Sequence, residues 1–97
     1  MSHQPPASFL APLRQLLATP GRFSIITHFN PDADALGSSL GLMHLLRAAG
    51  HEAQVVLPNT PSPDLHWMPG FADVLSHDTR PADCERALEQ CTALFCL

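Results

Sequence analysis

The sequence has few charged residues, and it lacks the clustered basic and long apolar segments that mark several classes of protein. Charged residues make up 14% of the 97 residues, against about 25% in typical soluble domains. Five basic and nine acidic side chains give a net charge of −4, and the basic ones form no cluster. This balance argues against a charge-driven nucleic-acid binder, and so against duplex DNA as a partner.

Membrane and secretion signals are also missing from the sequence. No apolar run approaches the about 20 residues that a membrane span requires, and the N-terminus has no basic region followed by an apolar stretch. The three cysteines, Cys84, Cys91 and Cys96, are odd in number and have no CxxC spacing. We therefore expect a cytoplasmic protein with reduced thiols and no contact with a membrane.

Apolar spacing predicts an α/β fold with a parallel sheet and helices on both faces, in three layers. Residues 1–7 are expected to form a flexible lead. Helices are predicted at 9–17, 35–49 and 81–90, and strands at 23–27, 54–57, 72–75 and 92–97. Pro12 should lie in the first turn of its helix, where a missing N–H does little harm. Gly37 and Gly41 lie in a second helix that is apolar around much of its circumference, so we expect it to be covered on more than one side.

One segment, from His28 to Ser38, concentrates the side chains that could carry chemistry. It follows the first predicted strand, and ligand sites in open α/β sheets form outside the carboxyl ends of strands. The turn-favouring Asn30-Pro31 pair would fold His28, Asp32 and Asp34 towards one point. Two like charges 4 Å apart repel by about 4 kcal/mol at an effective dielectric near 20. Converging carboxylates therefore favour a bound cation, and imidazole with carboxylate suits Mn²⁺, Zn²⁺ or Fe²⁺.

Each of these residues also has a structural interpretation. Asp34 could be the N-cap of the following helix, a position that aspartate favours. The Asn30-Pro31 pair with Asp32 could form an ordinary turn, and His28 could be a polar residue at a strand end. Taken one at a time these interpretations are the more frequent ones, but the whole cluster at a strand end favours a metal site.

The string His28-x-Asn30-Pro31-Asp32-x-Asp34-Ala35-x-Gly37-Ser38 resembles the first motif of the DHH phosphoesterase superfamily. It is most similar to the branch of nano-oligoribonucleases and 3′-phosphoadenosine-5′-phosphate phosphatases. The resemblance covers most of residues 8–97, with its specificity in 25–38. Ala33 stands where the family often has glycine, a small change that we expect to be tolerated.

The resemblance implies a two-metal site for Mn²⁺ or another divalent ion. His28 and Asp32 would bind one ion and Asp34 the second, with Asp32 and Asp34 as the catalytic residues. Asn30 would support the loop or contact the metal shell, and Ser38, placed at the helix N-terminus, could donate to phosphate or pack there. The implied reaction is attack of a metal-activated hydroxide on a phosphate ester of a short oligoribonucleotide, a nucleoside bisphosphate or a cyclic dinucleotide. A homodimer of the full-length protein is compatible with this interpretation.

The resemblance also implies that residues 8–97 are the N-terminal part of a DHH domain, cut within a strand before the second motif. The family's next aspartate, its Asp-His-His motif and its substrate-binding domain would follow Leu97. We therefore expect the 97-residue chain alone to be inactive. The alternative hypothesis is a non-catalytic nucleotide-binding or protein-interaction module in which the Asp-rich turn is structural.

Overall fold

Helices and strands alternate along the chain and build a four-stranded parallel sheet. The computed structural model describes residues 7–28 and 31–97. Its helices are α1 (Ala7–Ala18), α2 (Ala33–Ala48) and α3 (Pro81–Gln90), with 3₁₀ turns at Pro63–Leu65 and Phe71–Asp73; its strands are β1 (Arg22–Ile26), β2 (Glu52–Leu57), β3 (Leu75–Ser76) and β4 (Ala93–Cys96). Within these residues no helix is both long and apolar enough to cross a bilayer.

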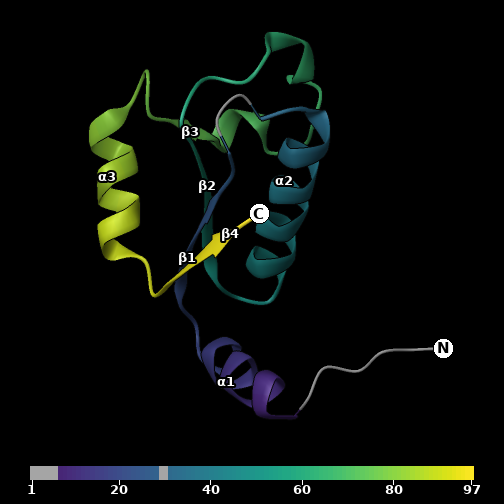
Figure 1. Cartoon of the computed structure of the whole chain (residues 1–97), viewed down its shortest axis with the longest axis vertical. Coiled ribbons are helices and arrows are strands. Elements are labelled where there is room, and N and C mark those ends of the chain that lie inside the picture. Colours follow the sequence, from purple (N-terminus) through teal and green to yellow (C-terminus); the bar gives the residue numbers. More distant parts are fainter. Residues whose placement is uncertain (1–6, 29–30) are drawn as a thin grey trace, which may run out of the picture.

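The sheet has the strand order β3-β2-β1-β4 and lies between α2 and α3 (Figure 1). Side chains alternate along β1: Phe23 and Ile25 join the core cluster with α2, whereas the Ser24 hydroxyl donates to the carbonyl of Ala87 in α3 at 3.0 Å. Both faces of the central strands are thus covered, which explains why they are apolar almost throughout. The prediction of an α/β fold with a parallel sheet and helices on both faces is confirmed.

Several predicted boundaries are wrong in instructive ways. The first helix begins at Ala7, so Pro12 lies in its second turn rather than its first, and the carbonyl four residues earlier loses its intrahelical partner. The predicted strand at 72–75 is displaced to Leu75–Ser76, because residues 71–73 form a 3₁₀ turn. The third helix is confirmed at 81–90. Of the predicted flexible lead 1–7, residues 1–6 lie outside the described residues and residue 7 opens α1.

Two glycines allow the chain to turn at the ends of α2 and of the loop beside it. Gly50 has φ +92° and ends α2, because a left-handed residue closes a helix without the strain that a Cβ would add. Gly70 has φ +89°, and a Cβ there would lie 2.7 Å from Cε of Met43. The loop therefore packs closely on α2, where the ring Nε2 of His44 lies 2.8 Å from the carbonyl of Pro69.

The coverage predicted for α2 is present on two sides only, within the part of the chain that is described. The sheet buries Leu36, Leu40 and Met43, and the loop around Gly70 covers a second side. A Cβ added to Gly37 or Gly41 would meet no described atom within 4 Å beyond the helix's own backbone. Both glycines instead border a shallow apolar cavity of about 260 Å³.

The cysteines are free, as expected. Cys84 is fully buried in the cluster between the sheet and α3, and this burial raises the pKa of its thiol above the ordinary value. A buried thiol of this kind is inert and serves as a small apolar side chain. Cys91 is half-buried and Cys96 exposed.

Candidate functional site

The predicted motif lies where the central strand β1 ends. β1 pairs with β2 on one side and with β4 on the other, so the motif is flanked by the carboxyl ends of two neighbours. A cavity of about 280 Å³ lies near this edge between the sheet and α3. Thr27, Pro58 and His77 line it, but none of His28, Asp32 and Asp34 does. The motif therefore occupies the position at which open α/β sheets form their ligand sites.

Asp32 holds the start of α2. Its backbone is extended, with φ −81° and ψ −180°, and its Oδ1 accepts from the backbone N–H of Ala35 at 2.8 Å. This is the geometry of an N-cap. The interpretation of Asp34 as the cap is therefore wrong, because the helix begins at Ala33, two residues earlier than predicted. Asp34 lies instead in the first turn, where its charge suits the positive end of the helix.

The other motif residues are placed as follows. His28 is exposed at the end of the strand, and Asp34 is exposed on α2. Asn30, predicted as loop support or metal-shell contact, lies outside the described residues. Ser38 is exposed and is the sixth residue of α2, so it lies in the second turn and its backbone N–H is not one of the four that a helix leaves open. The role of its side chain as a donor to phosphate stays a prediction.

The donor types in this loop fit a divalent cation, since imidazole and carboxylate oxygens are ordinary ligands of Mn²⁺ and Zn²⁺. Across residues 7–28 and 31–97, however, no group of three or more His, Cys, Asp or Glu side chains is gathered closely enough to hold an ion. The metal roles of His28, Asp32 and Asp34 stay predictions.

The same edge contains a contact that sequence reasoning missed. Asp78, after β3, accepts from the backbone N–H of Thr60 at 2.9 Å and from its hydroxyl at 2.7 Å. The two Thr60 bonds, the backbone one first, hold the pKa of the Asp78 carboxyl below its ordinary value of 3.8. Strand pairing is the signal that could have indicated this contact. Thr60 follows β2 and Asp78 follows β3, and these parallel neighbouring strands end at the same edge of the sheet. The bond ties together the turns beside the motif.

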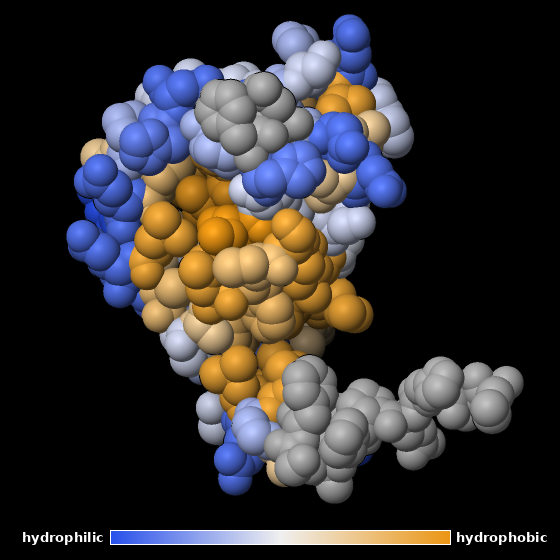
Figure 2. Space-filling view, in the orientation of Figure 1, coloured by the Kyte–Doolittle hydropathy of each residue, from blue (hydrophilic) through white to orange (hydrophobic). Residues whose placement is uncertain are grey.

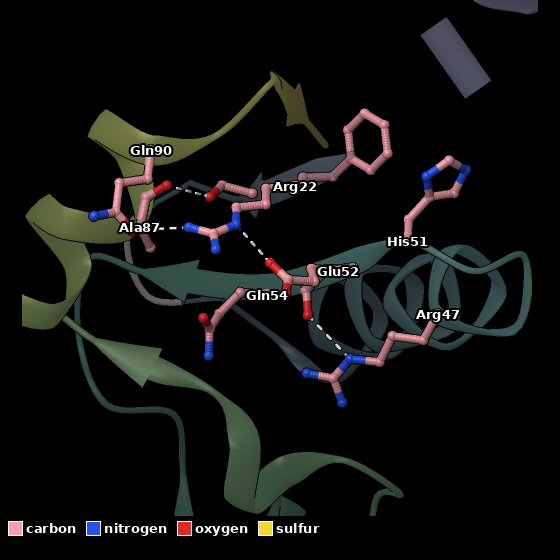
Figure 3. A pocket seen from close by; sticks show the side chains of 10 residues that line it. Arg22, Arg47, His51, Glu52, Gln54, Ala87 and Gln90 are labelled. Carbon is pink, nitrogen blue, oxygen red and sulfur yellow. Dashed lines mark hydrogen bonds and ion pairs between the residues drawn. The ribbon is translucent and has the colours of Figure 1, made fainter. Parts of the chain in front are cut away.

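A larger cavity, of about 420 Å³, lies at the opposite, amino edge of the sheet (Figure 3). Its polar side chains are used structurally: Arg22 pairs with Glu52 at 2.7 Å, and Nε of Arg47 donates to the carbonyl of Ala53 at 3.0 Å. Its size does not make it the better candidate, because it is remote from the strand ends that carry the motif.

His51 at this amino edge is buried, with only 6% of the residue exposed. Its Nδ1 accepts from the backbone N–H of Gly21 at 3.1 Å, and its ring meets that of Phe23 edge-on with centroids 4.9 Å apart. The residue is part of the core and has a structural role.

Comparisons with known proteins show which family the chain resembles over most of its length. Residues 22–96 match the DHH family, N-terminal domain. A stretch of 38 residues is 55% identical to the bifunctional oligoribonuclease and PAP phosphatase NrnA of Thermus thermophilus, covering 39% of this chain and 12% of that protein. The crystal structure of an exopolyphosphatase-related protein from Bacteroides fragilis superposes with a TM-score of 0.90 at 28% identity, over all of this chain and 28% of the other. The chain thus spans under a third of the length of these relatives.

Proposed function

Because the chain belongs to the DHH family, which it matches over residues 22–96, we propose that it carries the metal-binding motif of a phosphoesterase for small nucleotides. The observation that carries the proposal is the position of the motif at the carboxyl end of the central strand, with β2 and β4 ending on either side. A phosphate ester can approach this edge, whereas the faces of the sheet are covered by α2 and α3.

We assign His28 and Asp32 to one Mn²⁺ ion and Asp34 to a second, with Asn30 and Ser38 as supporting residues. The bound ions would supply positive charge and Lewis acidity at the phosphoryl group. This fits a chain of net charge −4, which has no basic cluster of its own for a polyanion.

The chain's own residues prepare this loop. Asp32 joins the loop to α2 through its bond to Ala35 at 2.8 Å, and the bond uses one carboxylate oxygen, Oδ1. The backbone N–H groups that a helix leaves open in its first turn point, in α2, towards the loop that carries the motif, and such groups favour an anion. Because the cap uses only Oδ1, the second carboxylate oxygen of Asp32 can bind a metal, so capping and metal binding are compatible roles for this residue.

The name of one relative supports the proposed substrate class. The Thermus protein is named as an oligoribonuclease and PAP phosphatase, which supports a short oligoribonucleotide or a nucleoside bisphosphate as substrate. We also propose a cyclic dinucleotide, which the resemblance of the motif implies, and a cytoplasmic location. The relatives are more than three times as long as this chain. We propose that further ligands and the substrate domain come from sequence equivalent to that remaining length, and that the 97 residues alone do not turn over substrate.

A non-catalytic module is the second candidate, and the capping bond of Asp32 favours it. In this alternative the Asp-rich turn only starts α2, and the motif binds nucleotide without turnover or serves a protein interface. The two candidates differ in whether the carboxylates of the motif bind a metal.

Titration of the chain with Mn²⁺, followed by isothermal calorimetry, separates them. We expect binding that weakens at least tenfold in Asp34→Asn, because the amide removes the anionic ligand, a loss of about 1.4 kcal/mol. Asp64→Asn is the matched control, since Asp64 is also exposed but lies in the 3₁₀ turn after β2. Equal Mn²⁺ affinity in the wild type and in Asp34→Asn would favour the module.

Turnover is tested separately on the 97-residue chain with Mn²⁺ and a dinucleotide or nucleoside bisphosphate. We expect no hydrolysis above that of an Asp34→Ala variant. Clear turnover that Asp34→Ala abolishes would disprove the proposed inactivity of this chain while supporting the metal site.

A further inference from the structure

We propose that the hydrogen bond between His51 and Gly21 is a pH-sensitive contact, which is formed while the imidazole is neutral and broken when the imidazole takes up a proton. The contact fastens the segment that follows α1 to the amino edge of the sheet. This inference concerns the fold and does not depend on the proposed reaction. It rests on the direction of one hydrogen bond, on burial and on the charges beside the ring.

The direction of the hydrogen bond determines which form of the imidazole fits the fold. The backbone N–H of Gly21 is a donor, and it lies 3.1 Å from Nδ1 of His51. Nδ1 is therefore an unprotonated acceptor, and in the neutral ring the proton is on Nε2. A protonated imidazole is a donor at both nitrogens, so it would direct a second N–H at that of Gly21. Proton uptake by His51 and this hydrogen bond exclude each other.

Burial holds the ring in place and removes the water that a charged ring would need. Only 6% of His51 is exposed, its backbone N–H donates to the carbonyl of Leu46 at 3.0 Å, and its ring meets that of Phe23 edge-on. A buried charge is costly unless it has a partner of opposite sign. The neutral ring therefore fits this environment, and the charged ring requires the contact to open.

The charged groups beside His51 are already paired with one another. Arg22 of β1, Arg47 of α2 and Glu52 of β2 line the cavity next to the ring. Glu52 pairs with Arg22 at 2.7 Å, and Arg47 pairs with Asp73 at 3.0 Å. Figure 3 shows the His51 ring turned away from Glu52 and Arg47. Both carboxylates are bound to guanidinium groups, so neither is a ready partner for a positive charge on His51.

Gly21 is the point at which α1 is joined to the sheet. Its N–H donates to His51, and its carbonyl accepts from the backbone N–H of Glu52 at 2.9 Å. Figure 1 places α1 beyond the amino ends of the strands, and Figure 2 shows that the apolar surface of the sheet region continues towards it. Leu16 of α1 packs against the core cluster. Proton uptake by His51 removes one of these two bonds and so loosens the connection between α1 and the sheet.

Nuclear magnetic resonance of the 97-residue chain tests the contact directly, without any variant. Between about pH 8 and about pH 5, the range in which histidine titrates, the shifts of the His51 ring nitrogens and of the Gly21 amide proton should change with the same midpoint. At the upper end of this range Nε2 should carry the proton. A ring protonated on Nδ1 there, or a Gly21 shift with another midpoint, would overturn the inference.

Amide hydrogen exchange measures the opening of the contact. The protection of the Gly21 N–H, corrected for the intrinsic pH dependence of exchange, should fall about tenfold over this range, which corresponds to the loss of about one net hydrogen bond. In His51→Asn the side-chain oxygen can accept at every pH, so the protection should stay constant. His66→Gln is the matched control, because it removes an exposed histidine and should leave the wild-type behaviour unchanged.

Circular dichroism at about pH 8, where histidine is mainly neutral, checks that both variants keep the fold. A wild type in which the protection of Gly21 is as independent of pH as in His51→Asn would overturn the inference. So would a His66→Gln chain that loses the pH dependence, because the responding group would then be another histidine.

Discussion

The two edges of the sheet use their polar residues differently. At the amino edge His51 binds Gly21, Arg22 pairs with Glu52 and Arg47 binds Ala53, so side chains there satisfy backbone groups and one another. At the carboxyl edge His28 and Asp34 are exposed. The larger cavity lies at the amino edge, at about 420 Å³ against about 280 Å³.

Cavity size and the position of the predicted motif are therefore separate properties of this fold, because the larger of the two cavities is not at the edge that carries the motif. Polar groups at the amino edge hold β1, β2 and α2 together. At the carboxyl edge Asp32 and Asp78 also accept from backbone N–H groups, while Asp34 is exposed in the first turn of α2. Because the strands are parallel, every loop that follows a strand lies at the carboxyl edge of the sheet, and this is the edge at which open α/β sheets form their ligand sites.

The largest expected effect is at the amino edge. His51→Ala removes the acceptor of the partly buried N–H of Gly21, which costs about 1–3 kcal/mol of unfolding free energy, and it removes the ring that meets Phe23. His51→Asn is the control, because its side-chain oxygen can replace Nδ1 as acceptor. Urea unfolding should show a larger loss for Ala than for Asn, and Mn²⁺ affinity should stay unchanged. A lower Mn²⁺ affinity in His51→Ala chains that remain folded would contradict a purely structural role for the polar residues of the amino edge.

The next effect tests the double role of Asp32. Asp32→Ala should lose about 1 kcal/mol of unfolding free energy with the cap, whereas Asp32→Asn should keep the cap and nearly all of the stability. We expect Mn²⁺ affinity to fall in both variants, because neither has the anionic oxygens. An Asp32→Asn chain that binds Mn²⁺ like the wild type would reduce Asp32 to a structural residue. Thermal unfolding and calorimetry measure the two properties.

The smallest effect concerns Asp78. Its folded pKa is lowered below 3.8, mainly by the Thr60 backbone bond, so the bond stabilises the fold above pH 3.8 and this contribution disappears as pH falls through the folded pKa. Asp78→Asn should therefore lower the unfolding midpoint slightly near neutral pH and have no effect in acid. Thr60→Val, which keeps the N–H, should have a weaker effect than Asp78→Asn. A difference between wild type and Asp78→Asn that persists below the folded pKa would contradict this origin.

The sequence predicted the order of elements, the two-sided coverage of the sheet and the limits of α3, because these follow from local apolar spacing and from Pro81 at a helix start. It also identified the motif. It assigned the helix cap to Asp34 instead of Asp32, since two aspartates two residues apart are equivalent in propensity. Packing decides between them: α2 begins at Ala33 and directs Leu36, Leu40 and Met43 at the sheet.

Local sequence alone determined that this chain alternates helix and strand and that His28, Asp32 and Asp34 are concentrated in one short segment. Only the tertiary structure decided that His51 is buried, that Thr60 meets Asp78 and that β4 lies at an edge. These properties depend on residues 18 to 70 positions apart in the chain, and a hydrogen bond over such a distance is set by strand order and register. Among the described residues, strand order likewise places the uncharged segment 91–97 beside β1.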